Sequence, residues 1–409
     1  MHNKKVLILA VSAALMAPGA YAQKGGGKDK EGADPDQVVE LYGKLYPEIV
    51  RQSGSGATSA SDSVATYAGA PTGTSSIIKR NEMESSNSRF GIRGHEKLGG
   101  GLRAVFQLET QFLLDSNNTG FAQRDSWVGL KHDRWGLVKL GRFDTPFKEY
   151  GDDISFLGVS SGNFTSTSAV FRRFGFGTSN AARFHERRQN SVQYESPDFG
   201  PFEFKVMYST DETDTATRKP HVWSAGGKWE LGNLAILVGY EIHKDLFGLS
   251  ANVPSAMRNN TDQAVRSKDT AAAIAFTYKL GAHQFEFDMN RKEWKETGTS
   301  VAGRAASYKN TAWIALWDAR WSPSWRTQIH YVKANKGTCT LVSADCITDG
   351  LEGTQISAGV AYYLSRRTFL FLMGQVLRNG KSAIFASGTQ TPSVGEDVRQ
   401  IAAGIHTIF

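Results

Sequence analysis

Apolar and polar residues alternate with a period of two along most of the chain. In the segment PFEFKVMYS, Phe202, Phe204, Val206 and Tyr208 occupy one set of positions, and mostly charged or polar residues occupy the other. A β-strand places successive side chains on opposite faces, so this pattern predicts strands with one apolar face and one polar face. The alternation recurs in other segments, among them 102–112, 234–242 and 284–290.

Short and long connections alternate between these segments. The short ones carry Gly, Pro, Asp or Ser and lie at 98–101, 133–136, 197–200, 230–233, 280–283, 321–324 and 364–367. The long ones are polar and lie at 52–85, 115–122, 144–186, 211–220, 246–267, 295–306, 336–352 and 379–396. Seven short and eight long connections separate sixteen strands. The segment 368–378 is apolar on both faces, so its register stays open.

Two all-β architectures could use such strands. A β-sandwich also alternates, but its strands usually have only five or six residues, whereas these have about ten. A transmembrane β-barrel explains the length and the regular alternation of connections, because its closed sheet pairs every backbone group within the membrane. We therefore predict a sixteen-stranded antiparallel transmembrane β-barrel, with short periplasmic turns, long extracellular loops, lipid outside and a polar lumen.

The first residues are typical of a secretory signal peptide. Lys4 and Lys5 precede an apolar run over 6–17, and Ala20-Tyr21-Ala22 forms a small-x-small cleavage site. The run is too short to span a membrane as a helix. We predict that residues 1–22 are removed and that residues 23–409 form one barrel domain.

The C-terminal residues continue the alternation to the last position. Ile401, Ala403, Ile405, Thr407 and Phe409 form one set in the segment DVRQIAAGIHTIF. Chain ends usually fray, so an end that stays in pattern indicates a strand built into a sheet. We expect this set to face lipid while the last strand closes against the first one, near Val39, Leu41 and Leu45.

Charge and cysteine content narrow the function. The net charge is +7, which becomes +5 without the two lysines of the leader. The cations are dispersed, whereas nucleic-acid binding needs a concentrated basic patch, so we expect no nucleic-acid partner. Cys339 and Cys346 match no metal-binding spacing, and in an oxidising compartment they favour a disulfide over two free thiols.

The chain offers no clear catalytic chemistry. Its histidines are scattered, and neither a Gly-x-Ser-x-Gly nor a His-Glu-x-x-His stretch occurs. We therefore predict no enzyme activity, no cofactor and no metal site. The alternatives that stay open are an outer-membrane enzyme, a secreted ligand-binding β-sandwich and a substrate-specific channel of the same barrel fold.

Several segments, taken in order, resemble a known family. They are VELYGKLY, SRFGIRGHEKLGGGLRAVFQLE, RDSWVGL followed by WGLVKLGRFDTPF, RRQNSVQYESPDFG and the terminal Phe409. The set resembles the general porins of Gram-negative outer membranes, above all the trimeric porins of the Bordetella, Burkholderia and Neisseria kind. The resemblance implies a homotrimer in outer-membrane lipid and lipopolysaccharide, each barrel with a water-filled pore for small hydrophilic solutes and ions. It also implies that Phe409 is the assembly signal read by the barrel-assembly machinery.

In this family the third loop folds inward, and its acidic residues face a basic wall across the pore constriction. Carried onto this sequence, the basic residues are Lys44, Arg89, Arg93, Arg124 and Arg187. The loop here reads TPFKEYGDDISF, so its candidate acids are Glu149, Asp152 and Asp153. Since rings of basic side chains favour anions, the five cations and the net charge predict a weak anion preference.

Overall fold

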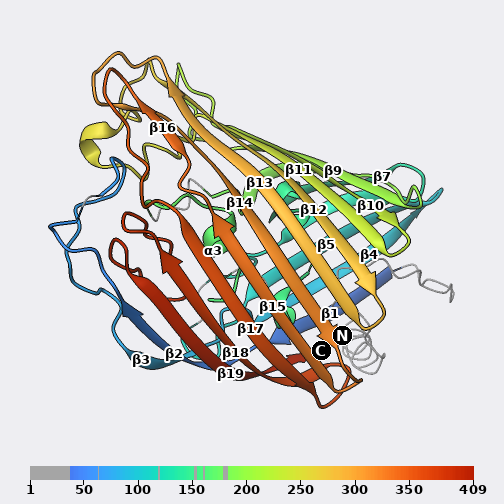
Figure 1. The fold of residues 1–409 in the computed structure, drawn as a ribbon. Helices are drawn as coiled ribbons and strands as arrows, with labels where there is room; N and C mark the ends of the chain where they lie inside the picture. Colours follow the sequence, from blue (N-terminus) through green and yellow to red (C-terminus); the bar gives the residue numbers. More distant parts are fainter. Residues whose placement is uncertain (1–36, 63, 118–119, 152–153, 160–161, 178–182) are drawn as a thin grey trace.

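The computed structural model describes residues 37–409 except 63, 118–119, 152–153, 160–161 and 178–182. The predicted signal peptide and two of the predicted constriction residues, Asp152 and Asp153, lie outside the described residues. Tilted antiparallel strands wrap around a central space, which holds short helical segments of the chain (Figure 1). Among the described residues, no helix is long and apolar enough to cross a membrane.

One sheet contains all the described strands. They are β1 (Gln37–Leu45), β2 (Glu48–Ser55), β3 (Arg80–Glu84), β4 (Arg89–Gly99), β5 (Leu102–Gln111), β6 (Ser126–His132), β7 (Gly136–Asp144), β8 (Arg187–Glu195), β9 (Phe202–Thr210), β10 (His221–Leu231), β11 (Leu234–Lys244), β12 (Arg266–Leu280), β13 (His283–Thr297), β14 (Ala305–Arg320), β15 (Trp325–Ala334), β16 (Thr338–Leu341), β17 (Gly353–Tyr363), β18 (Thr368–Asn379) and β19 (Asp397–Ile408). Each strand pairs with its neighbours in antiparallel register.

The 19 segments form 16 spanning strands, because three strands are each interrupted once. β1 and β2 run in sequence along the same neighbours, and the break between them contains Pro47, which has no N–H to donate to a ladder. β3 and β4 form the second interrupted strand. β15 and β16 form the third, since both pair with β14. The prediction of a sixteen-stranded barrel is confirmed.

The seam joins β19 to β2 and to the end of β1. Ile401 and Phe409 are each 51% exposed on the outer face, as predicted for the last strand. The predicted partners were partly wrong. Leu45 does pair with Thr407, but Ala403 lies opposite Ile49. The reason is register: Phe409 already reaches Gly43, so Val39 and Leu41 pair only with β4.

Strand β18 shows why its register could not be read from the sequence. Leu372 is 50% exposed on the outer face, whereas Phe371 is 4% exposed on the inner face. Phe371 packs there with Leu157 and Phe164, which belong to the connection between β7 and β8. Both faces of the strand are therefore apolar because both meet apolar surroundings, lipid outside and a folded loop inside.

The connection 145–186, which we call loop 3, packs against the inner wall of the barrel. It contains α2 (Pro146–Glu149), η1 (Phe156–Gly158) and α3 (Ser168–Phe171). Its backbone is held by polar side chains of the wall: the amide of Ile154 donates to Glu286, and the carbonyl of Phe171 accepts from Asn290. Gln328 accepts from the amide of Leu157. Loop 3 therefore follows the lumen side of the sheet.

Two glycines on facing strands make room for the start of loop 3. Gly226 and Gly239 are cross-strand partners on β10 and β11. A Cβ at Gly226 would lie 2.6 Å from the ring of Tyr150, and one at Gly239 would lie 3.1 Å from the ring of Phe147. Glycine inside a strand often marks such a close approach. These positions let α2 lie flat against the wall instead of blocking the lumen.

Candidate pore constriction

A chain of alternating charges begins on β4 and β5. The Glu109 carboxylate on β5 lies between two guanidinium groups, 3.5 Å from Arg89 Nε and 2.5 Å from Arg124 Nε. It also accepts a hydrogen bond of 3.1 Å from the Tyr42 hydroxyl. Arg89 and Glu109 are close because the register places them diagonally across β4 and β5, where Gly91 faces Glu109. Glu109 is therefore held by the side chains of Arg89, Arg124 and Tyr42, and its carboxylate bridges the two guanidinium groups.

The chain of charges continues from Asp125 to loop 3. Asp125, the neighbour of Arg124, accepts from Arg187 Nε on β8. Arg187 Nη2 also lies 2.8 Å from Asp144 Oδ1, which in turn lies 2.9 Å from Lys148 Nζ. Lys148 belongs to α2, so the network ties the loop to the wall at its first turn. Burial, partly offset by the ion pair with Asp144, lowers the pKa of Lys148.

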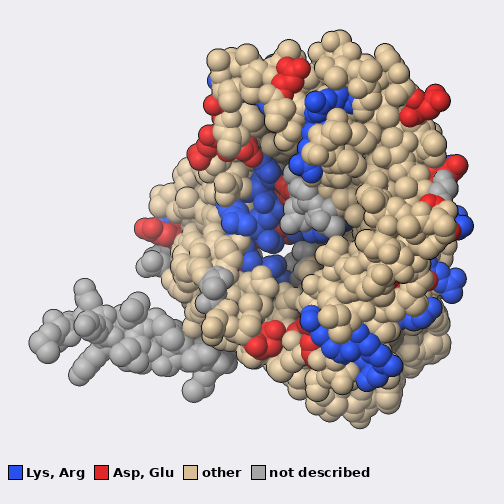
Figure 2. Space-filling view, turned by 90° about the vertical axis from the view of Figure 1, so that its left-hand side faces the viewer, with Lys and Arg blue, Asp and Glu red and all other residues tan. Residues whose placement is uncertain are grey.

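We call these seven residues the constriction network. Its members are four cations and three acids, namely Arg89, Arg124, Lys148, Arg187, Glu109, Asp125 and Asp144. The network has one excess positive charge if all the members are ionised. The helices of loop 3 lie against β9–β11 and against β14, β15 and β17, whereas the network residues other than Lys148 lie on β4–β8 and their connections. Figure 2, which views the barrel from the left-hand side of Figure 1, shows Lys and Arg side chains gathered around a central hollow.

Three of the predicted cations meet in the constriction network, namely Arg89, Arg124 and Arg187. Lys44 does not join it. Its side chain is buried under loop 3, where Nζ donates a 2.6 Å hydrogen bond to the carbonyl of Gly158. Arg93 lies four residues further along the same face of β4, where its Nε bonds Glu40 at 2.9 Å and its guanidinium lies 5.0 Å from the Tyr42 ring centroid. The register of β1 with β4 places Lys44 directly opposite Arg89, so it is the contact with loop 3 that keeps the Lys44 ammonium out of the network.

Glu149 anchors loop 3 rather than facing the basic wall across the lumen. Its carboxylate lies 2.6 Å from Lys205 Nζ on β9. Lys205 lies 3.7 Å from Glu195, which pairs with Lys139 at 2.6 Å. Of the three candidate acids, Glu149 is thus directed to the wall beneath α2, because α2 lies against β9–β11, and the other two lie outside the described residues.

The acids of the network were missed at the level of sequence. Glu109 stands on the polar face of β5, Asp144 follows a register shift between Gly141 and Phe143 on β7, and Asp125 follows the predicted Arg124 directly. The alternation placed Glu109 on the polar face but could not show that it lies between two arginines. That distinction depends on strand register, which a single sequence does not specify.

Other connections close over the ends of β2 and β19. Glu396 accepts hydrogen bonds from the amides of Ser76 and Ser393, at 2.9 Å each, and so joins the connection after β2 to the one after β18. Cys339 and Cys346 are joined in a disulfide, with Cα atoms 5.8 Å apart. Among the residues with described positions, no group of three or more His, Cys, Asp or Glu could hold a metal ion.

A family model described as "Gram-negative porin" matches residues 9–382. The chain belongs to this family. It is an integral β-barrel protein of the outer membrane. The major outer membrane protein P.IB of Neisseria gonorrhoeae is 25% identical over 320 residues, which cover 76% of this chain and 83% of that relative.

Solved structures show the same fold. The anion-selective porin of Comamonas acidovorans superimposes with a TM-score of 0.65 at 20% identity, over 91% of this porin and 100% of that chain. OmpT of Vibrio cholerae in its trimer form gives a TM-score of 0.59 at 15% identity, over 92% of this porin and 100% of that chain. The resemblance read from the sequence motifs is thus confirmed by the family match.

Proposed function

We propose that this porin forms a water-filled channel through which small hydrophilic solutes and ions diffuse passively, with a weak preference for anions. The observation that carries the proposal is the constriction network, in which four cations face three acids beside a loop folded into the lumen. The anion-selective neighbour from Comamonas acidovorans supports the same direction of selectivity.

Selection in such a pore follows from size and from the electric field. Loop 3 fills part of the lumen along β9–β11, β14, β15 and β17. The wall that carries most of the constriction network lies beside the opening that remains. Charges in a narrow pore with low-dielectric walls are less screened than those on an open surface. An excess positive charge there attracts anions, but neighbouring acids weaken the attraction. We therefore expect permeability to differ between anions and cations by a small factor.

The assembly and its surroundings are part of the proposal. The trimer form of the Vibrio cholerae neighbour supports a homotrimer. The leader at residues 1–22 would direct export, and the barrel-assembly machinery would read the strand that ends at Phe409. The outward apolar residues would then face outer-membrane lipid and lipopolysaccharide.

Planar-bilayer recording of the purified porin across a salt gradient tests the proposal. We expect conductance steps in multiples of three. We also expect a reversal potential whose sign indicates a preference for anions. Absence of conductance in protein that migrates as a folded barrel would exclude the channel. Cation preference would overturn only the selectivity, and single-unit closures would overturn only the trimer. Saturation of conductance by one sugar or amino acid would instead indicate a substrate-specific channel.

A further inference from the structure

Three cations form a row on the lumen face of the barrel, away from the constriction network. Lys97 on β4 lies directly opposite Arg103 on β5, and Arg103 lies directly opposite Lys131 on β6. Their neighbours Leu98 and Leu130 are 49% and 52% exposed on the outer face, so the alternation of the strands directs the three cations inward. We call Lys97, Arg103 and Lys131 the basic row.

The basic row lies at the end of the barrel that carries the short turns. Lys97 and Arg103 stand on either side of the tight connection between β4 and β5, and Lys131 stands just before the one between β6 and β7. Short turns of such barrels are periplasmic. Six residues separate Arg103 from Glu109 of the constriction network along β5, which is about 20 Å in an extended strand. A small solute on the basic row therefore does not reach the constriction network at the same time.

An acid beside the basic row offsets only part of its charge. Arg103 Nη1 lies 3.2 Å from Asp133 Oδ1, and the Asp133 side chain is 65% exposed. An exposed ion pair of this kind contributes little to stability, so an incoming anion can take the place of Asp133. The three cations and Asp133 together carry two net positive charges when all four are ionised. These charges line the wall of the solute path.

We propose that the basic row binds small tricarboxylates as they pass the periplasmic mouth of the pore. Neighbouring strands lie about 4.8 Å apart, so cations directly opposite each other on three strands present their charges at similar intervals. A small tricarboxylate can place a carboxylate against each of two or three of these cations, whereas a monocarboxylate meets one. The guanidinium of Arg103 can also bind a carboxylate through two parallel hydrogen bonds. The inference rests on the proposed channel, because solutes reach the row through the lumen.

Such a site makes the pore treat oligovalent anions differently from chloride. Rings of basic side chains favour anions, so the empty row attracts chloride to the periplasmic mouth. A bound trivalent anion turns the local charge from positive to negative. Citrate should therefore lower the current that chloride carries, and this effect should depend on the basic row rather than on loop 3.

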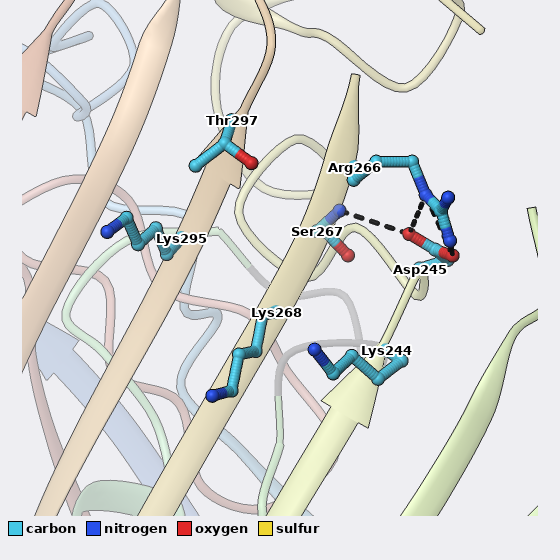
Figure 3. A pocket seen from close by; sticks show the side chains of 7 residues that line it. All are labelled: Lys244, Asp245, Arg266, Ser267, Lys268, Lys295 and Thr297. Atoms are coloured by element: carbon cyan, nitrogen blue, oxygen red, sulfur yellow. Dashed lines mark hydrogen bonds and ion pairs between the residues drawn. The ribbon is translucent and has the colours of Figure 1, made fainter. Parts of the chain in front are cut away.

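Calorimetric titration of citrate into the folded porin in detergent tests this site. The double variant Arg103→Gln/Lys131→Gln should weaken citrate binding about tenfold, from roughly threefold per exposed charge pair. Lys131→Gln alone should weaken it about threefold. The matched control uses another row of three cations, Lys244, Lys268 and Lys295, which lies on the outer face of β11–β13 at the end with the long connections (Figure 3). Lys268→Gln/Lys295→Gln removes the same charge there and should bind citrate as the parent protein does.

Four results would overturn the proposal. Equal citrate affinity in the parent and in Arg103→Gln/Lys131→Gln would exclude the basic row. An equal loss in the outer-face control would mean that only net charge matters. A tenfold loss in Arg124→Gln, which leaves the basic row intact, would place citrate at the constriction network. Acetate binding as tight as that of citrate would exclude recognition by the spacing of the cations.

The current in potassium chloride separates this proposal from the channel proposal. Both the parent and Arg103→Gln/Lys131→Gln should conduct, and added citrate should reduce the current of the parent more than that of the variant. A parent protein that does not conduct would refute the channel. Equal reduction of the current in a conducting parent and a conducting variant would refute only the tricarboxylate site.

Discussion

Phe409 and Gly43 are joined by two backbone hydrogen bonds at the seam of the barrel. The Gly43 amide donates to the Phe409 carbonyl at 3.0 Å, and the Phe409 amide donates to the Gly43 carbonyl at 3.1 Å. A Cβ at Gly43 would lie 2.4 Å from the Phe409 ring. The terminal aromatic ring thus occupies the space that a side chain at Gly43 would need, and the two residues close the sheet together.

Replacement of the terminal ring should impair assembly more than conduction. We expect Phe409→Ala to reduce the fraction of heat-modifiable barrel on unheated SDS gels several-fold, because the seam loses its last apolar contact. Barrels that do form should keep their conductance and reversal potential. Phe287→Ala is the matched control, since Phe287 is also an outward aromatic residue, 50% exposed, but lies in mid-sheet. Equal losses in both variants would mean that the terminal position has no special role.

Reversal of charge in the constriction network should change ion selectivity. Arg124→Glu places a second acid beside Glu109, so the reversal potential should shift toward cations. Glu109→Gln removes a carboxylate that pairs with two arginines, so the reversal potential should shift toward anion preference. Arg399→Glu, on the outward face of β19 with Ile401, is the control and should shift the reversal potential little. Shifts in the same direction for Arg124→Glu and Glu109→Gln would exclude a role for their charge.

Loss of the Lys44 contact should free loop 3 without altering selectivity. Lys44→Met removes the ammonium that binds the carbonyl of Gly158 but keeps the apolar stem. We expect more fluctuation in the open-channel current and an unchanged reversal potential. A clear shift of the reversal potential toward cations would show that Lys44 acts on permeating ions after all. Lys336→Met, at an exposed ion pair with Asp349, serves as the control for loss of one lysine.

As the pH rises, anion preference should begin to fall at a lower pH than the titration of ordinary lysines would cause. The pKa of Lys148 is lowered by burial, so this lysine loses its charge below the usual lysine pKa of about 10.4 as pH rises. The constriction network then loses its excess positive charge. Reversal potentials measured between pH 7 and pH 10 should show this loss in the parent protein, while Lys148→Met should lack that component. Identical pH profiles would remove Lys148 from the field in the pore.

The disulfide should stabilise its loop rather than the barrel. Cys339 and Cys346 are seven positions apart, and closure of so short a loop contributes about 2 kcal/mol to the folded loop in a chain-entropy account. Cys339→Ser/Cys346→Ser should increase protease cleavage between residues 336 and 352 several-fold. The heat-modified gel shift should not change. Loss of the folded band would mean that the bond also supports barrel assembly.

Prediction from sequence was strongest where one face of a strand meets lipid. The set Ile401, Ile405 and Phe409 was placed correctly because a period of two fixes which residues share a face. It was weakest where loop 3 covers the wall, as at β18 and at Lys44. There a side chain on the inner face meets protein rather than water, so its polarity no longer reports its position.

The sequence by itself determined the sixteen strands, their apolar outer faces and the order of short and long connections, because these follow from alternation and turn chemistry along the chain. Only the tertiary structure decided which charges meet. Arg89 and Arg124 share Glu109, and Arg187 and Lys148 share Asp144, through the register of β4 to β8 and the path of loop 3. Such contacts join residues distant along the chain, and their distances depend on how neighbouring strands align, which the local pattern of one strand does not contain.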